Sequence, residues 1–244
     1  MAKEQESGPA RRAGDRGRYG RLSRERVLAA ALELVDREGL SALSMRRVGA
    51  ELGVEAMALY RYAASKDALL DGLVEALYLE LEERLTAEPG APAATEAPAW
   101  RTGLHRIART TFDVCLVHPR AVPLLTTRML AVPLARRPAS VLRNHERVLA
   151  LLAEAGVDEA TAATAFRAFT AWLLGYVSVE LQPMVDNPEE SDPAFRLGVH
   201  RMPAQELPRL RRAAAALAEG GGLEGLTAGL DALLDRHVGG PRRV

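Results

Sequence analysis

Apolar side chains recur at intervals of three and four residues along almost the whole chain, the spacing of helices with one buried face. The first such stretch follows Ser23, a residue type that caps helix N-termini, and stops at Gly39, a type that ends helices. Its apolar positions are Val27, Leu28, Ala31, Leu32 and Val35. The pattern predicts a helix between Ser23 and Gly39.

Two short helices and one longer helix are predicted next. Ser44 can cap the first of them, and Gly53 ends it. After the turn, a third helix is predicted from about Glu55 to Tyr62, and Ser65 then caps the longer helix. The apolar stripe of this longer helix consists of Leu69, Leu70, Leu73, Val74 and Leu77.

The segment AEPGAPAATEAPA, residues 87–99, predicts a linker between a small helical domain at residues 22–86 and a larger one at residues 100–240. Helices of the larger domain are predicted near residues 100–117, 120–131, 138–155, 158–182, 205–219 and 223–238. Pro183 is one of the predicted breakers, and residues 184–204 are predicted to form a mobile loop. Because no convincing strand pattern or internal repeat is present, the predicted fold is all-α.

The net charge of zero hides a basic N-terminal part. Residues 1–66 hold 13 Lys and Arg against 9 Asp and Glu, a net charge of +4, and the rest hold 19 against 23. This asymmetry indicates that only the N-terminal part meets a polyanion. Residues 1–21 are predicted to be a flexible basic arm, whose arginines, including Arg18 and Arg21, either enter a DNA minor groove or stay solvated.

Several classes of protein are disfavoured. No apolar run reaches the roughly 18 residues that span a bilayer, and residues 1–20 lack the apolar centre of a signal peptide, so we expect a cytoplasmic protein. Cys115 is the single cysteine, which excludes an intrachain disulfide. The histidines lack metal-ligand spacing, and neither a phosphate-binding glycine loop nor a nucleophile elbow is present. No catalytic residue, cofactor or metal is predicted, and the chain is not expected to be an enzyme.

Two short helices joined by a glycine turn, with a supporting helix on each side, are the elements of a helix-turn-helix. Leu59 is the predicted inward anchor of the second short helix. This leaves Met57, Tyr60 and Arg61 to face the major groove, while Tyr62 reaches the phosphate backbone. The alternative is a corner of a helical bundle that contacts no DNA.

The stretch RVLAAALELVDREGLSALSMRRVGAELGVEAMALYRYAASKDALLDGL, residues 26–73, resembles the N-terminal domain of the TetR family of bacterial transcriptional regulators. The resemblance implies that Arg46 reads a guanine and that Lys66 binds phosphate at the start of the fourth helix. It also implies phosphate contacts by hydroxyl-bearing side chains. The DNA-contacting residues predicted in this way are Ser44, Arg46, Arg47, Met57, Tyr60, Arg61, Tyr62 and Lys66, together with Arg18 and Arg21 of the arm.

One position departs from the family pattern. Ala56 stands where the family has a polar base reader, so the operator must differ from that of the tetracycline repressor. Met57, through a thymine methyl group, and Arg61, through a base or phosphate, are the predicted substitute contacts.

The resemblance extends more diffusely into the body, through WRTGLHRIARTTFDVCLVHPRA, LLAEAG and WLLGYVSVE, which resemble the ligand-binding domain of the tetracycline-repressor branch. It implies a body that forms a homodimer and binds a small effector. The helices at residues 158–182 and 223–238 match the pair that forms a four-helix dimer interface in the family. Their alanine-rich faces permit close approach between two chains, but they can also pack inside one chain.

The effector is expected to be a hydrophobic small molecule without a metal. Leu125 and Ile107 stand where the tetracycline repressor uses a histidine and an amide for its magnesium chelate. The candidate ligand-binding residues are Ile107, Thr111, Cys115, Leu125, Met129, Phe169, Trp172 and Tyr176. Each of them could equally be part of the core.

The predicted function is therefore that of a TetR-like regulator, namely a repressor that a hydrophobic effector releases from a pseudo-palindromic operator in double-stranded DNA. Two alternatives stay open: a ligand-responsive activator of the same fold, and a helical protein-interaction module that binds no DNA.

Overall fold

The computed structural model describes residues 22–87, 97–186, 189–198, 201, 203 and 205–238. Throughout these ranges the regular secondary structure is helical and no strand occurs, which confirms the all-α prediction. The described part of the chain contains no helix that is both long and apolar enough to cross a membrane. The predicted arm and most of the predicted linker lie outside the described residues.

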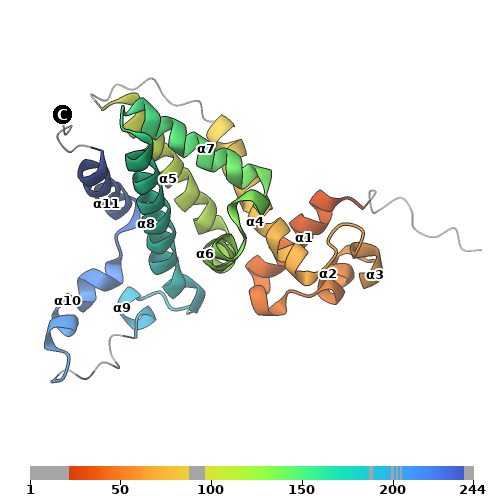
Figure 1. Ribbon diagram of the computed structural model, residues 1–244. Helices are drawn as coiled ribbons and strands as arrows, with labels where there is room; N and C mark the ends of the chain where they lie inside the picture. The colour runs from red at the N-terminus through yellow and green to blue at the C-terminus, as the bar shows by residue number, and fades with distance from the viewer. Residues whose placement is uncertain are drawn as a thin grey trace, which may run out of the picture.

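Four helices form a small domain, the head, at one end of the molecule (Figure 1). They are α1 (Arg24–Glu38), α2 (Met45–Leu52), α3 (Ala56–Leu59) and α4 (Lys66–Ala87). The predicted caps are present: the Ser23 hydroxyl accepts a hydrogen bond from the Arg26 amide at 3.3 Å, and the Ser65 hydroxyl accepts one from the Ala68 amide at 3.0 Å. Local hydrogen bonding thus begins these helices where the sequence predicts.

The remaining helices form the body. They are α5 (Ala99–Val117), α6 (Val122–Ala131), α7 (Ala139–Glu154), α8 (Glu159–Asp186), α9 (Pro193–Arg196), α10 (Pro208–Glu219) and α11 (Gly222–His237). The long helix α4 starts in the head and packs against α5, α6 and α7 of the body. One continuous set of buried apolar side chains therefore runs through both parts.

Three predicted boundaries were wrong. The third helix is shorter than predicted, because it ends at Leu59 and residues 60–62 form a turn. Pro183 lies inside α8 rather than breaking it. A proline removes the helical hydrogen bond of the carbonyl four residues earlier, and that residue here is Val179, which is 73% exposed. Part of the predicted 184–204 loop is also helical, since α9 lies within it.

Candidate DNA interface and effector-binding region

A close approach between backbones shapes the turn between α2 and α3. Gly53 adopts a left-handed conformation with φ 66° and ψ 30°, which a glycine tolerates at no steric cost. At Gly49 an added Cβ would lie 2.8 Å from the carbonyl oxygen of Val54, so the two segments touch there. Leu59 is fully buried, which confirms its predicted role as the inward anchor. Together these residues fix how α3 projects from the head.

The outer surface of α2, α3 and the following turn carries unpaired polar and cationic groups. The side chains of Met57 and Tyr60 are 76% and 46% exposed. Arg46, Arg61 and Lys66 are exposed as well, and none of them makes a hydrogen bond or ion pair to another described residue. The structure therefore leaves three cations of this surface free to meet an anionic partner.

Ser44 and Arg47 already have partners within the head. The Ser44 hydroxyl caps α2 by accepting from the Arg47 amide at 3.2 Å, which leaves its own proton free to be donated. The Arg47 guanidinium donates to both carboxylate oxygens of Glu38, at 2.6 and 2.7 Å. This ion pair lowers the pKa of Glu38 and joins α2 to the end of α1. The predicted DNA contact of Arg47 thus competes with an intramolecular one.

Tyr62, a predicted phosphate contact, already has a hydrogen-bond partner within the head. Its hydroxyl donates its single proton to the carbonyl oxygen of Leu22 at 2.8 Å, across the head. The turn after α3 brings the ring against the segment that precedes α1, which the sequence pattern could not show. In this arrangement Tyr62 stabilises the head, while Tyr60 is 46% exposed. Arg18 and Arg21 lie outside the described residues.

The predicted effector-binding residues do not surround one cavity. Ile107, Cys115, Leu125 and Phe169 are at most 5% exposed and belong to the closed core. Burial raises the pKa of the Cys115 thiol to about 12, so the thiol is uncharged at neutral pH. The Thr111 hydroxyl donates to a carbonyl of its own helix. The side chain of Met129 lies outside the described part of the structure.

The two aromatic candidates on α8 pack against α11, and the ring of Tyr176 also lies 6.3 Å from that of Phe112 on α5. The rings of Trp172 and Tyr176 lie 5.5 Å apart, and an added Cβ at Gly229 or Gly225 of α11 would collide with them. The Tyr176 hydroxyl also donates to the carbonyl oxygen of Gly222 at 2.6 Å. Glycines thus let α8 and α11 pack closely through these rings, a contact between distant segments that periodicity does not reveal.

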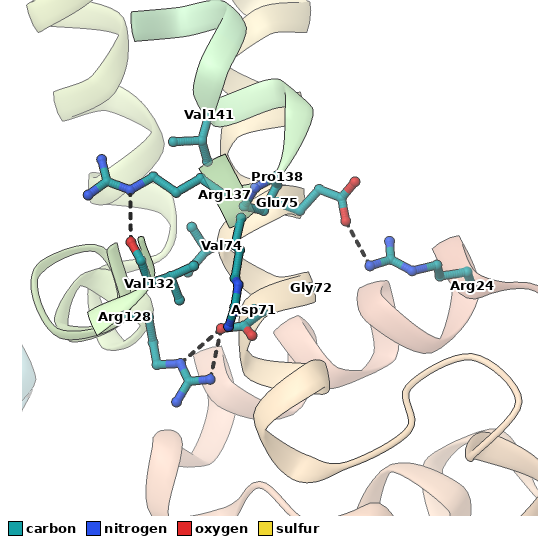
Figure 2. A pocket seen from close by; sticks show the side chains of 11 residues that line it. Arg24, Asp71, Gly72, Val74, Glu75, Arg128, Val132, Arg137, Pro138 and Val141 are labelled. Atoms are coloured by element: carbon teal, nitrogen blue, oxygen red, sulfur yellow. Dashed lines mark hydrogen bonds and ion pairs between the residues drawn. The ribbon is translucent and has the colours of Figure 1, made fainter. Parts of the chain in front are cut away.

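Two cavities lie elsewhere in the described structure. One, of about 140 Å³, is bounded by α1, α4 and the chain between α6 and α7 (Figure 2). The other, of about 480 Å³, lies between α5, the end of α8, α9 and α10. None of the seven candidates whose side chains the structure describes lines either cavity. The sequence could not show which of the candidate side chains the core would enclose.

Ion pairs between head and body were missed by the sequence analysis. Arg128 of α6 binds two carboxylates at the start of α4: Asp71 at 2.8 Å and Asp67 at 3.0 Å. Asp67 adjoins Lys66, one of the free cations of the head. Since the partners lie 57 and 61 residues from Arg128, no local pattern could have identified them. These contacts link α6 to the end of α4 that carries the predicted phosphate contact.

A second link joins α1 to the body. His118, between α5 and α6, pairs with Asp36 of α1 at 2.7 Å and with Glu80 of α4 at 2.9 Å. Its hydrogen bond to Asp36 is the main cause of a raised pKa, so the imidazole holds its proton more tightly than usual. Arg120 also donates to the carbonyl oxygens of Asp36 and Arg37 at the end of α1. Head and body are therefore joined by directional polar contacts as well as by apolar packing.

The fold and the exposed surface of the head together define a DNA-binding protein of the helix-turn-helix class. Residues 27–73 match the tetR family of bacterial regulatory proteins, and residues 91–235 match the tetracyclin repressor-like C-terminal domain. The second match alone covers more than half of the chain. The chain belongs to the TetR family.

Two proteins are similar to this chain in sequence, and one solved structure is similar to it in fold. A helix-turn-helix-type transcriptional regulator of Saccharopolyspora erythraea is 35% identical over 159 residues, which are 65% of this chain and 61% of that protein. The transcriptional repressor DrrR1 of Streptomyces coeruleorubidus is 31% identical over 166 residues, 68% of this chain and 56% of that protein. Both matches span less than two thirds of the relative's length.

The solved structure is that of the TetR family protein ActR of Streptomyces coelicolor in complex with actinorhodin. It has a TM-score of 0.67 with this chain at 22% sequence identity, and the superposition covers 91% of this chain and 98% of ActR. At this identity the likeness shows the shared fold.

Proposed function

We propose that this chain is a homodimeric repressor that a small-molecule effector releases from its operator. The observation that carries the proposal is the surface of the head, where Arg46, Arg61 and Lys66 are exposed and have no partner among the described residues. A guanidinium at Arg46 can donate to guanine O6 and N7, and Lys66 at the start of α4 suits a phosphate. Repression is supported by the relative DrrR1, which is named a repressor.

The proposed dimer interface is the outer surface of α8 and α11, which lie side by side away from the head (Figure 1). Small or apolar side chains are exposed there at helical spacing, among them Ala171, Gly175 and Val179 of α8 and Ala228 and Ala232 of α11. No atom lies within 4 Å of a Cβ built at Gly175, so a second helix can approach closely. Glu180 accepts hydrogen bonds from the first amides of α11 and thereby fixes the two helices relative to each other.

The proposed route of induction passes through the polar links between head and body. A ligand shifts a conformational equilibrium only by its different affinity for the two states. An effector that moves α6 would pull on Asp67 and Asp71 through Arg128 and so tilt the start of α4. The spacing of the two heads would then no longer fit successive major grooves, whose centres lie about 34 Å apart.

The test is a gel-shift titration of DNA from the gene's own upstream region and of random DNA of equal length. Arg46→Ala should cost about 1–3 kcal/mol on the cognate DNA and reduce discrimination, while Lys66→Ala should weaken binding to both DNAs alike. Arg209→Ala, a change at an exposed arginine of α10, is the matched control and should change nothing. If Arg46→Ala lowers the affinity for both DNAs equally, the guanine contact is refuted. If no protein–DNA complex forms with the unaltered chain, the proposed function is refuted.

A promoter fusion in cells decides the direction of control. Deleting the gene should raise expression from the upstream promoter if the protein is a repressor. Lower expression would instead identify an activator.

A further inference from the structure

The cavity between α4 and the α6–α7 connection has walls of two kinds (Figure 2). Val74, Val132, Pro138 and Val141 supply apolar surface. The remaining side chains are almost all charged and include more arginines than carboxylates. A cavity of this kind suits a ligand that is largely apolar and carries a charge at one end.

The carboxylates of the cavity are already neutralised. Asp71 pairs with Arg128 at 2.8 Å, and Glu75 pairs with Arg24 at 2.7 Å. Figure 2 shows both pairs, together with the guanidinium of Arg137, which points away from Glu75 and toward the carbonyl of Val132. The cavity itself therefore contains no free anion.

Two arginines of the cavity lining have no carboxylate partner among the described residues. Neither Arg136 nor Arg137 forms an ion pair with a carboxylate in the described ranges of the chain, and Arg137 makes only a 3.3 Å hydrogen bond to the carbonyl oxygen of Val132. Arg137 is also half-buried, where an uncompensated cation is costlier than in water. The lining thus has an excess positive charge that an anionic group would neutralise.

A buried histidine lies behind the apolar wall. His145 is 5% exposed, and neither ring nitrogen has a hydrogen-bond partner among the described residues. It follows Val141 by one helical turn on the same face of α7, and its pKa is lowered by burial and also by the charge of Arg137. Buried polar groups without partners are rare in folded proteins, so this pair of nitrogens is a second indication of a ligand, independent of the arginines.

We infer that the effector is a hydrophobic acid whose carboxylate binds Arg137 and Arg136, with a second polar atom hydrogen-bonded to His145. This inference rests on the proposed function. The cavity, of about 140 Å³, holds the acidic end of such a ligand. The apolar part of the ligand extends along α7 and displaces side chains of the cavity wall. Because Arg128 and Arg24 line the same cavity, the carboxylate also competes with Asp71 and Glu75 for their pairs. Of these two pairs, only Arg128–Asp71 joins the body to the head, and binding thereby loosens that link.

The probes are 6-hydroxy-2-naphthoate, whose hydroxyl supplies a second polar atom, 2-naphthoate, which has none, and their uncharged methyl esters, titrated against the full-length protein. Binding is followed by calorimetry and by the fluorescence of Trp100 and Trp172. Each acid should bind at least roughly tenfold more tightly than its ester, because a hydrogen bond to a charged group contributes more than one to a neutral group. Equal affinities of acid and ester, or no binding of either acid at millimolar concentration, would overturn the inference.

Three variants locate the site. Arg137→Gln should weaken acid binding about 10- to 100-fold and leave ester binding unchanged, while Arg137→Lys should restore most of the preference. Arg209→Gln on α10 is the matched control and should behave as the unaltered chain. His145→Leu should weaken 6-hydroxy-2-naphthoate but not 2-naphthoate, although the unliganded protein melts at the same or a higher temperature, a result that mere damage to the fold would not give. An unchanged acid preference in Arg137→Gln refutes the site.

A parallel gel-shift separates this inference from the proposed function. If the acids bind in an Arg137-dependent manner but do not change operator affinity, the site stands and induction through it fails. If the acids release the operator equally from the unaltered chain and from Arg137→Gln, induction stands and the site fails.

Discussion

His145 should make the protein acid-sensitive. In the folded chain its pKa is lowered to about 4, because burial disfavours the charged ring and Arg137 adds repulsion. In the unfolded chain a histidine titrates near about 6.5. Below that pH the unfolded state binds a proton that the folded state does not bind, so the free energy of unfolding falls as the pH drops through 6.5 towards 4. Between about pH 7.5 and 5 the loss from this residue amounts to about 2 kcal/mol.

The contribution of His118 to stability depends on pH in the opposite direction, so its effect has to be distinguished from that of His145. The pKa of His118 is raised, chiefly by its hydrogen bond to Asp36. Its contribution to stability is therefore complete below about pH 6.5 and is lost as the pH rises through its higher folded value. The pH profile of the unaltered protein contains both effects, and only a comparison with a variant isolates one of them.

The assay is urea unfolding of the unaltered chain and of His145→Leu at several pH values between about 7.5 and 5, at one protein concentration because association affects stability. Since leucine leaves no unpaired nitrogens, the variant should equal or exceed the unaltered chain by about 1–3 kcal/mol at neutral pH. The amount by which the variant's free energy of unfolding exceeds that of the unaltered chain should then grow by about 2 kcal/mol towards pH 5. His237→Leu, in the last turn of α11, is the matched control and should show no such growth. Parallel pH profiles for the unaltered chain and His145→Leu would refute the reasoning.

Three further outcomes follow from the geometry. Gly49→Ala would place a Cβ 2.8 Å from the Val54 carbonyl, so it should destabilise the head by about 1–3 kcal/mol and weaken operator binding, as measured by urea unfolding and gel shift. Ala171→Glu should give a monomer by sedimentation that has lost most operator affinity, whereas Ala216→Glu on α10 should stay dimeric; a dimeric Ala171→Glu would contradict the interface. Deleting residues 1–20 should flatten the slope of log affinity against log salt by roughly two to four units if the arm's arginines bind phosphate, and an unchanged slope would show that they do not.

The sequence alone determined what depends on near neighbours. Periodicity and capping residues such as Ser23, Ser44 and Ser65 predicted most helices, since a cap and its amide partner lie only three residues apart. Leu59 and Gly53 were likewise assigned correctly, because anchor and turn belong to one local motif. Of the exposed cations of the head, Arg61 was predicted from that same motif, while Arg46 and Lys66 were predicted from the resemblance to the TetR family.

Tertiary structure decided which polar groups already form hydrogen bonds or ion pairs within the chain and where cavities remain. Tyr62 bonds to Leu22 across 40 residues, and Arg128 reaches Asp71 across 57, distances along the chain at which no spacing rule applies. The candidate effector residues have the composition of a pocket, but apolar residues fill a core and line a pocket equally well. Whether helices close over such side chains or leave a cavity depends on how their surfaces interlock, which is set by the packing of all helices together.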